Sequence, residues 1–427
     1  MAPSLVEFNG DSNRTDAVAA TSKSASTSPD KFALFRRLVP VASDGKVTFL
    51  NASFAPPANL ITHAAITRYA NEALQDCHPK PAWQTAGAET RAALARYINA
   101  PSADDIAFMR DTTEGLNSFI HSIKFQPGDN VVILDTEHPN HGYGWMAMRS
   151  FGLEVRQVPT IATAEKSGVT AATADTFAAY VDERTIAIGL SSIMFHSGQW
   201  NDVAGIAAAF RPKGIHVLVD MTQQVGFADV DVQQLGVSAA AFGMHKGLNC
   251  PTGLAALYVD PKVIPELTNP PPVVGYGAVQ NVRGDLLVPS EELIFHPSAR
   301  RFEHLNISLI AIAAARAWIE FYVDVMKPKD VEEHLFRLGD ALRVQLKPLG
   351  IDIVGPTSRQ QHAPHLYILD LHDSRWVQLL KDNNIIVTPY RLGIRVSFGF
   401  YNNLDDVERI SQVLAKGVEA DIPLGRQ

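Results

Sequence analysis

The sequence predicts an α/β protein: a large domain on a mostly parallel sheet covered by helices, followed by a smaller α+β domain. Short, nearly continuous apolar runs alternate with helical patterns through the middle of the chain, which is typical of strands buried on both faces. Beyond residue 306 this regular alternation ends. The 427 residues are 46% hydrophobic and 19% charged, which suits one or two large folded domains.

The N-terminal part of the chain is expected to contain a tail and a docking segment. Residues 1–30 are rich in Ser, Thr and Ala, so we expect a disordered tail. Its acids, such as Glu7 and Asp11, argue against a mitochondrial presequence. Residues 31–70 are expected to pack with the small domain. They hold a short strand within residues 48–57, which two prolines interrupt, and most of a helix over about 61–74.

The large domain is expected to span residues 71–305. A proline-rich loop over 77–83 precedes a helix over about 85–98. Further helices are expected around residues 115–123, 143–150, 176–181 and 203–210. Sheets of this kind bind ligands outside the carboxyl ends of their strands. The apolar runs that predict the strands are Val131–Leu134, Val155–Pro159, Ile186–Leu190, Val217–Val219, Ala239–Phe242 and Leu254–Val259.

The small domain is expected to span residues 306–427. An irregular stretch with Pro270-Pro-Pro272 and Gly275-Tyr-Gly277 precedes it and is expected to form a loop over the site. A long helix from Ile307 to about Val325 leads into the domain. The elements expected after it are a helix at 331–346, strands at 352–354 and 365–371, a helix at 376–382, a strand at 394–398 and a helix at 404–417.

Charge and cysteine content exclude several classes of function. A formal net charge of −8 gives no basic surface for nucleic acid or anionic membrane. No apolar run is long enough to cross a bilayer. The two cysteines, Cys77 and Cys250, cannot form a disulfide framework and indicate a reducing compartment. We therefore expect a cytoplasmic protein without a metal site, acting on a small molecule.

An acid and a lysine at neighbouring strand ends form the central pair of candidate residues. Asp220 ends the apolar run Val217–Val219, and Lys246 follows the run Ala239–Phe242 within Phe242-Gly-Met-His-Lys-Gly247. Pyridoxal 5'-phosphate (PLP) requires this pair: the lysine amine forms a Schiff base with its aldehyde, and the acid keeps the pyridine nitrogen protonated. Taken singly, each residue is also consistent with a surface lysine or an N-capping aspartate. Their shared place at the strand ends favours the cofactor interpretation.

Two further groups lie where the same ligand would bind. Asp111-Thr-Thr-Glu-Gly115 opens a helix, and its hydroxyls and free backbone N–H groups suit a cofactor phosphate. The alternative is an ordinary capping box with Thr112 or Thr113 as the cap. His138 follows a strand end and could stack on a pyridine ring, whereas a lone loop histidine is often only exposed.

Arginines near the start of a small-domain strand are candidates for binding a substrate carboxylate. Arg395 lies in Leu392-Gly-Ile-Arg-Val-Ser-Phe-Gly-Phe-Tyr-Asn402, and its planar guanidinium can bind a carboxylate through two hydrogen bonds. A structural ion pair is the alternative. Arg391 is a second candidate cation four residues earlier.

Taken together, these motifs resemble the class V aminotransferases of PLP fold type I, which include cysteine desulfurases, kynureninases and isopenicillin N epimerase-like proteins. The motifs occur in the order Thr-Thr-Glu-Gly, Glu-His, Ser-x-x-x-x-x-x-Gly, Asp-x-x-Gln, His-Lys and Arg-x-Ser-x-x-x-Tyr-Asn. Each is loose, but six in this order are specific, and they cover roughly residues 49–414. The resemblance implies a large domain with a seven-stranded type of sheet, a smaller α+β domain and a homodimer whose sites lie at a two-fold interface.

The resemblance also implies a role for each matching residue. Lys246 would bind the cofactor aldehyde and move a proton at the substrate Cα. Asp220 would pair with the pyridine nitrogen, and Gln223 would donate a hydrogen bond to the phenolic oxygen. The other implied contacts are His138 on the ring, Thr112, Thr113 and His245 at the phosphate, Asn306 reaching a neighbouring subunit's phosphate, and Arg395, Arg391 and Ser53 at the substrate.

Three positions depart from the pattern of the desulfurases. Gly243 stands where they often carry a serine three residues before the lysine, so one phosphate contact is missing. Leu305-Asn306 replaces the familiar Gly-Thr, and Phe195 replaces an asparagine near the cofactor. A desulfurase also needs a thiolate on the loop before the carboxylate-binding arginine, yet residues 384–394 contain no cysteine. Desulfuration through a persulfide on that loop is therefore not expected.

The residues themselves do not distinguish among the reactions that share a Cα carbanion. The Phe195 variant, the short loop from Arg391 to Arg395 and the missing thiol look most like fungal secondary-metabolism members of the family. We therefore expect a lyase or transferase that makes or breaks the Cβ–Cγ bond of a free amino acid. Arg391, His141 or His304 would then bind the γ substituent. Transamination and epimerisation are the alternatives, and a PLP-fold protein without activity is disfavoured because Lys246, Asp220 and Arg395 are all present.

Overall fold

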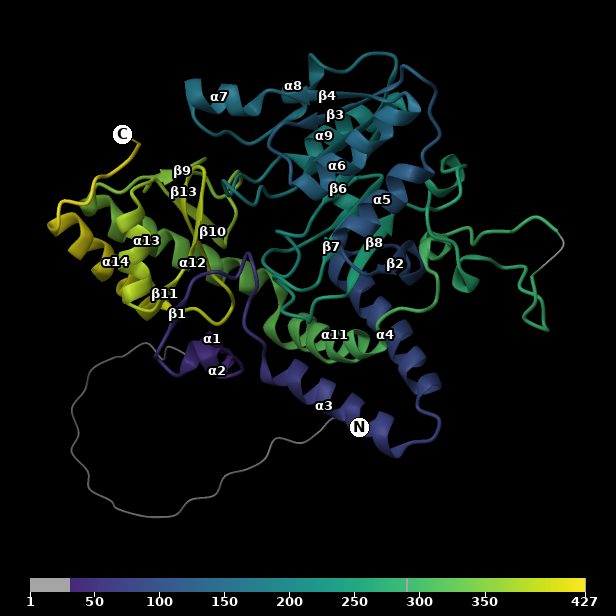
Figure 1. Cartoon of the computed structure of the whole chain (residues 1–427), viewed down its shortest axis with the longest axis horizontal. Coiled ribbons are helices and arrows are strands. Elements are labelled where there is room, and N and C mark those ends of the chain that lie inside the picture. Colours follow the sequence, from purple (N-terminus) through teal and green to yellow (C-terminus); the bar gives the residue numbers. More distant parts are fainter. Residues whose placement is uncertain (1–30, 289–290, 427) are drawn as a thin grey trace, which may run out of the picture.

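The computed structural model describes residues 31–288 and 291–426 and confirms the predicted α/β class. Figure 1 shows a larger body containing the main sheet and a smaller lobe at the C-terminal end of the chain. The predicted tail, residues 1–30, lies outside the described residues. In the part of the chain that is described, no helix has the length and apolar character required to cross a bilayer.

The large domain is organised around a seven-stranded sheet in the order β2-β8-β7-β6-β5-β3-β4. Only β8 runs antiparallel to its neighbours. Every residue of most of these strands is buried, as expected for a sheet covered on both faces. The strands are β2 (Ile106–Met109), β3 (Asn130–Leu134), β4 (Glu154–Val158), β5 (Thr185–Ser191), β6 (His216–Asp220), β7 (Ala239–Gly243) and β8 (Ala255–Val259).

Helices connect these strands and cover both faces of the sheet (Figure 1). Four of the predicted helices are present with limits shifted by a few residues, and α9 has the predicted limits. The helices of this domain are α4 (Lys80–Ile98), α5 (Thr112–Ser122), α6 (Pro139–Ala147), α7 (Thr160–Ser167), α8 (Ala174–Ala178), α9 (Val203–Phe210) and α10 (Val232–Leu235).

Several predicted limits were wrong. The helix expected from residue 85 begins at Lys80, inside the predicted loop, because Pro81 lies in its first turn, where no intrahelical N–H is required. Strand β2 and helix α7 were missed. The strand expected within residues 48–57 is only β1 (Thr48–Phe49). The helix expected over residues 307–325 is α11 (Leu309–Phe321), which is followed by a π-helical turn over Tyr322–Met326.

The small domain pairs a four-stranded antiparallel sheet with helices on one side, at the left of Figure 1. Its sheet has the order β12-β13-β10-β9. The elements are α12 (Pro328–Leu346), β9 (Ile353–Val354), β10 (Leu366–Leu369), α13 (Ser374–Asp382), β11 (Ile385–Ile386), β12 (Thr388–Tyr390), β13 (Gly393–Ser397) and α14 (Leu404–Glu419).

The N-terminal segment is joined to the small domain by backbone pairing. It contains α1 (Lys31–Arg36), α2 (Pro40–Ser43), β1 and α3 (Leu60–Gln75). Strand β1 runs parallel to β11, and Asn51 bridges to Ser397 on β13. This pairing brings residues 51–54, which follow β1, toward the end of β13 and the boundary between the two domains.

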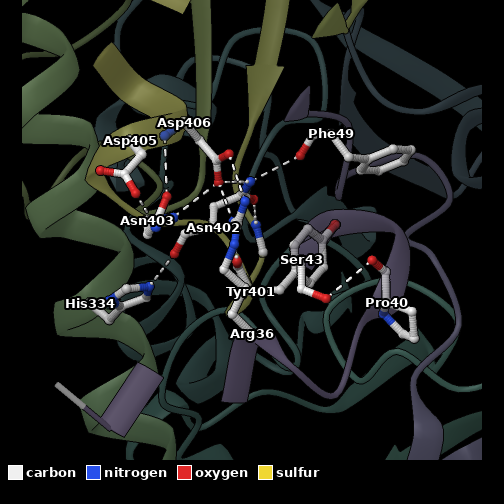
Figure 2. A network of polar contacts seen from close by, with 11 residues as sticks. Arg36, Pro40, Ser43, Phe49, His334, Tyr401, Asn402, Asn403, Asp405 and Asp406 are labelled. Carbon is white, nitrogen blue, oxygen red and sulfur yellow. Dashed lines mark hydrogen bonds and ion pairs between the residues drawn. The ribbon is translucent and has the colours of Figure 1, made fainter. Parts of the chain in front are cut away.

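A buried polar network reinforces this attachment (Figure 2). Arg36 donates to the Tyr401 carbonyl oxygen at 2.7 Å and forms an ion pair with Asp406 at 2.6 Å. The Asn402 side chain donates to Phe49 O at 3.0 Å and to Asp406 Oδ2 at 2.9 Å. The Tyr-Asn pair at the end of the Arg-x-Ser motif therefore ties the N-terminal segment to α14, away from the strand-end cavity described next.

Candidate active site

The residues predicted at the strand ends line one cavity of about 330 Å³. The cavity lies outside the carboxyl ends of the parallel strands, where the topology predicts ligand binding. Its walls also come from the N-terminal segment and from the small domain. The lining residues are Ser53, Phe54, Asp111, Thr112, Thr113, His138, Asn140, Ser191, Ile193, Phe195, Asp220, Thr222, Gln223, His245, Lys246, Tyr390 and Arg395.

Asp220 and Lys246 reach the cavity because their strands are neighbours. β6 ends at Asp220, which pairs in register with Ala241 of β7, and Lys246 follows β7 by three residues. The buried Asp220 carboxylate accepts a hydrogen bond from the Thr222 backbone N–H at 2.9 Å. Burial lowers the pKa of Lys246 to about 8, and this effect outweighs the nearby negative charge of Asp220.

The turn after β6 and the turn that carries Lys246 pack backbone against backbone. Gly226 has φ +84°, a left-handed conformation that glycine adopts readily. A Cβ at Gly226 would clash with the carbonyl carbon of Gly247, the residue after Lys246. Glycine at this position therefore allows the lysine turn to approach the Asp220 turn.

The start of α5 forms one end of the cavity. Asp111 caps the helix by accepting from the Glu114 N–H at 2.8 Å, and the backbone N–H groups before Glu114 have no acceptor within the helix. The hydroxyls of Thr112 and Thr222 lie 2.8 Å apart. His245 lines the same end, and burial next to Lys246 lowers its pKa to about 4. A neutral histidine, two hydroxyls and a helix N-terminus together suit a phosphate group.

Gly243 has a steric reason to lack a side chain. A Cβ at this position would lie 2.8 Å from His245 Nδ1 and 3.1 Å from Thr112 Oγ1. The Thr222 hydroxyl instead lies next to Gly243, because the Gly243 N–H donates to it at 3.3 Å. A hydroxyl at residue 222, which the sequence analysis did not single out, therefore lies beside the position where desulfurases often carry a serine.

His138 and Phe195 form part of an aromatic wall. Phe195 contacts His138 edge-on with ring centroids 5.0 Å apart, and Tyr390 at 5.7 Å. Burial lowers the pKa of His138, so its ring is neutral near pH 7. The buried carboxylate of Glu137, the residue before His138, accepts from Ser191 Oγ at 2.6 Å and Ser191 N at 3.0 Å. Ser191 ends β5, so the strand-end rule that identified Asp220 also applies to it.

Arg395 is almost completely buried and only partly hydrogen-bonded. Its exposed fraction is 1%, and Nη1 donates to the Phe195 carbonyl oxygen at 3.0 Å. Its guanidinium lies 4.6 Å from the Tyr390 ring centroid. Nε and Nη2 have no hydrogen-bond partner among the described residues. Burial lowers the pKa of Arg395 to about 10, so the side chain remains charged at neutral pH.

Four other sequence candidates lie outside the cavity. Arg391 is exposed and lines a neighbouring cavity of about 310 Å³. His141 is fully buried, 3.7 Å from Glu137 Oε2, and has no hydrogen-bond partner among the described residues. His304 and Asn306 line a third cavity, together with residues 109 and 110. Within one chain, Asn306 is therefore separate from the Lys246 cavity.

Neither cysteine lines the cavity. Cys77 is exposed and lies beside α3, and Cys250 is buried. Burial raises the pKa of the Cys250 thiol, which keeps it protonated. Across residues 31–288 and 291–426, no group of histidine, cysteine and acidic residues is placed to hold a metal ion.

Comparison with known proteins gives matches over nearly the whole described chain. A family described as aminotransferase class-V matches residues 62–410. The uncharacterized aminotransferase C777.03c of Schizosaccharomyces pombe is 48% identical over 390 residues, covering 91% of this chain and 96% of that protein. A probable cysteine desulfurase of Methanothermobacter thermautotrophicus is 29% identical over 268 residues, covering 62% of this chain and 63% of that protein.

Solved structures of the protein C-DES share the fold. One, a mutant with glycine covalently linked to its PLP cofactor, has a TM-score of 0.79 and 21% identity, covering 91% of this chain and 99% of that one. A second is titled as a complex of the cystine C–S lyase C-DES with its reaction product, cysteine persulfide. Its TM-score is 0.77 at 21% identity, covering 91% of this chain and all of that one.

Proposed function

Because the chain belongs to the class V aminotransferase family of PLP-dependent enzymes, we propose that it is a lyase that breaks a bond to the β carbon of a small free amino acid. The observation that carries the proposal is a single cavity that holds Lys246, Asp220 and a buried arginine with unused donors, but no thiol. Transamination is the second candidate, favoured by the name of the 48% identical relative.

The cavity residues fit pyridoxal phosphate. No hydrogen bond or ion pair to Lys246 Nζ occurs within the described residues, and only one Asp220 oxygen accepts a described hydrogen bond from a neighbouring side chain or N–H. Lys246 would bind the aldehyde, Asp220 the pyridine nitrogen and Gln223 the phenolic oxygen. The start of α5, with Thr112, Thr113, His245 and Thr222, would hold the phosphate. When bound, the cofactor supplies an electron sink for a bond broken at the substrate Cα.

Lys246 would move a proton at the substrate Cα. With its pKa near 8, its amine is partly neutral near physiological pH, as a general base requires. A β-elimination needs proton removal from Cα and departure of the β substituent, and yields pyruvate, ammonium and the leaving group after one water is added. His138 is neutral and lines the same cavity, so it adds no charge beside the reacting atoms.

Arg395 would bind the substrate α-carboxylate. Its Nε and Nη2 groups have no hydrogen-bond partner among the described residues, and they belong to the planar set of donors that matches a carboxylate. Its Nη1 group already donates to the Phe195 carbonyl oxygen. A buried guanidinium with two unused donors is costly, so an anionic partner stabilises it. Ser53 is a second candidate contact, because its buried Oγ also has no hydrogen-bond partner among the described residues.

The positions of the remaining cations favour a short side chain on the substrate. The Cβ–Cγ reaction expected from the sequence needs groups for a γ substituent, and Arg391, His141 and His304 all lie outside the cavity. Cleavage at Cβ itself needs no such group. The place of the reaction in fungal secondary metabolism and in the cytoplasm stays a prediction based on family likeness and composition.

The absence of a thiol in the cavity distinguishes the proposal from a desulfurase that passes sulfur to its own cysteine. C-DES, which shares the fold, is titled a cystine C–S lyase. A sulfur leaving group on the β carbon is therefore the first class of substrate to test, followed by other β-substituted alanines.

The experiment supplies purified holoprotein with L-amino acids in heavy water, with and without a keto acid, and follows products by NMR. Pyruvate and ammonium without a keto acid would support β-elimination. Alanine deuterated at the β carbon from a γ-substituted substrate would establish Cβ–Cγ cleavage instead. Amino transfer only in the presence of the keto acid would make the protein an aminotransferase, and loss of optical purity with deuterium only at Cα would make it an epimerase. Lys246→Ala is the inactive control in each arm.

A further inference from the structure

His365 is a buried histidine of the small domain that contacts the cavity wall from behind. It immediately precedes β10, is fully buried, and stacks on Phe227 with ring centroids 3.7 Å apart and an interplanar angle of 5°. It does not line the cavity itself. Its Nε2 lies 3.3 Å from Oε1 of Gln223, a large-domain residue that does line the cavity.

The hydrogen bonds around Gln223 settle which way its amide points. Gln223 Nε2 lies 3.1 Å from the Ser53 carbonyl oxygen, which can only accept a hydrogen bond. The amide nitrogen must therefore face Ser53, and the amide oxygen must face His365. Because the oxygen can only accept, His365 must carry its hydrogen on Nε2. One N–H of the Gln223 amide remains unused by these contacts.

The surroundings of His365 favour a single proton on its ring. Nδ1 has no hydrogen-bond partner among the described residues, so a second N–H there would be buried and unsatisfied. The titratable groups whose charges act on His365 are Arg395, His362 and Lys246, all cationic or neutral. Burial, followed by these charges, lowers the pKa of His365 well below its ordinary value. The histidine is therefore a neutral donor.

We propose that His365 is a positioning residue: by donating from Nε2 to the Gln223 amide oxygen, it holds the remaining amide N–H toward the cavity, where it would bind the cofactor's phenolic oxygen. This inference rests on the proposed PLP chemistry. Gln223 then joins the N-terminal segment through Ser53 to the small domain through His365.

The test is a double-mutant cycle read by the absorbance of the bound cofactor. His365→Leu removes the donor, and His365→Gln keeps an N–H near the position of Nε2. Loss of a donor to the phenolic oxygen makes that oxygen more basic, so we expect His365→Leu to raise the pH midpoint of the visible band by about one unit. His365→Gln should leave the midpoint close to wild type.

The cycle also tests whether His365 acts through Gln223. Gln223→Leu alone should produce the same upward shift, and adding His365→Leu to it should produce no further shift. Additive shifts, or a midpoint unchanged in His365→Leu, would overturn the proposal. Thermal unfolding of the cofactor-free variants separates a loss of packing, expected in both His365 variants, from the effect on the cofactor. A wild-type protein without a visible band would instead count against the proposed function.

Discussion

The positive charge of Lys246 is destabilised by burial. Removal from water favours its neutral form, whereas Asp220 favours the charged form. The effect of burial is the larger, so the pKa of Lys246 is lowered. An exposed lysine has a pKa of about 10.4 and would be almost fully protonated at pH 8. The position of Lys246 therefore provides a nucleophilic amine near neutral pH, before any cofactor is bound.

This leads to a pH prediction for cofactor-free protein. Only the neutral amine can attack an aldehyde, and the pKa is lowered, so the rate of PLP capture should rise with pH and level off above a midpoint near pH 8. Stopped-flow absorbance measures this rate. Lys246→Arg should capture no PLP covalently. A midpoint near the value of a free lysine would show that the amine is solvated and contradict the account.

Arg395 provides a second prediction, on substrate affinity. Arg395→Gln should lower kcat/KM by about 10- to 100-fold, mainly through KM, because a hydrogen bond to a charged group contributes about 1.5–3 kcal/mol. Arg395→Lys should recover little, since an ammonium lacks the planar fork. The matched control is Arg391→Gln, whose exposed side chain lines the neighbouring cavity. A larger loss in this control would reverse the assignment of the two arginines.

Sequence reasoning at this scale identified residues whose positions follow from strand ends. Asp220, Lys246 and His138 were placed by this rule, and all three line the cavity. Thr222, Ser191 and His365 were not identified. Thr222 contacts Thr112 and Gly243. His365 contacts Gln223, which lies 142 residues earlier in the chain. Such contacts depend on how turns and domains pack, which a linear pattern does not contain.

At the scale of elements, the two turns that carry Asp220 and Lys246 depend on close backbone contact. Gly226→Ala should destabilise the protein by about 3 kcal/mol or more, since it combines a left-handed φ with a clash against Gly247. Gly214→Ala is the matched control: φ is +79°, but a Cβ there meets no atom within 4 Å. Its cost should be about 1 kcal/mol.

Urea unfolding measures both costs, and PLP capture reports on the lysine turn. Gly226→Ala should also impair capture, because the substitution pushes on the residue next to Lys246. Equal destabilisation by the two substitutions would show that conformational strain alone accounts for Gly226 and that the turns are not in tight contact.

The elements that were predicted correctly are those with strong, uninterrupted patterns. The central strands β3, β5, β6 and β7 have continuous apolar runs because both of their faces are covered. Strand β2 was missed although all four of its residues are buried: it is short and pairs only with the antiparallel β8 at the sheet edge. The start of α4 was missed because Pro81 was interpreted as a loop residue rather than as part of a first turn.

At the scale of the whole molecule, the cavity is closed by three parts of the chain that are distant in sequence. Ser53 follows β1 in the N-terminal segment, Lys246 belongs to the large domain, and Arg395 belongs to the small domain. The network of Arg36, Asn402 and Asp406 fixes the first of these parts to the last (Figure 2). The α/β class was predictable, and the family resemblance led to the expectation that Ser53, Lys246 and Arg395 share one site. The backbone pairing and the polar network that hold these three parts together could not be predicted from a linear pattern.

The family implies a homodimer, which leads to a prediction about Asn306. In one chain, this exposed residue lies in a different cavity from Lys246. If it reaches the partner's phosphate site, Asn306→Asp should weaken PLP binding by repulsion between carboxylate and phosphate. Mixing Asn306→Asp with Lys246→Ala subunits should then restore activity that neither has alone, because one of the two sites in a mixed dimer is intact. No restoration after confirmed subunit exchange would place both residues in the same chain's site.

We propose that Lys246 holds the cofactor in the cavity that it lines together with Asp220 and Arg395. The most direct test is borohydride reduction of the purified holoprotein, which makes the lysine–cofactor bond permanent, followed by digestion and mass spectrometry. We expect the added mass on Lys246 and no added mass after reduction of Lys246→Ala. A label on another lysine, or none in a protein that shows the visible band of bound PLP, would contradict it.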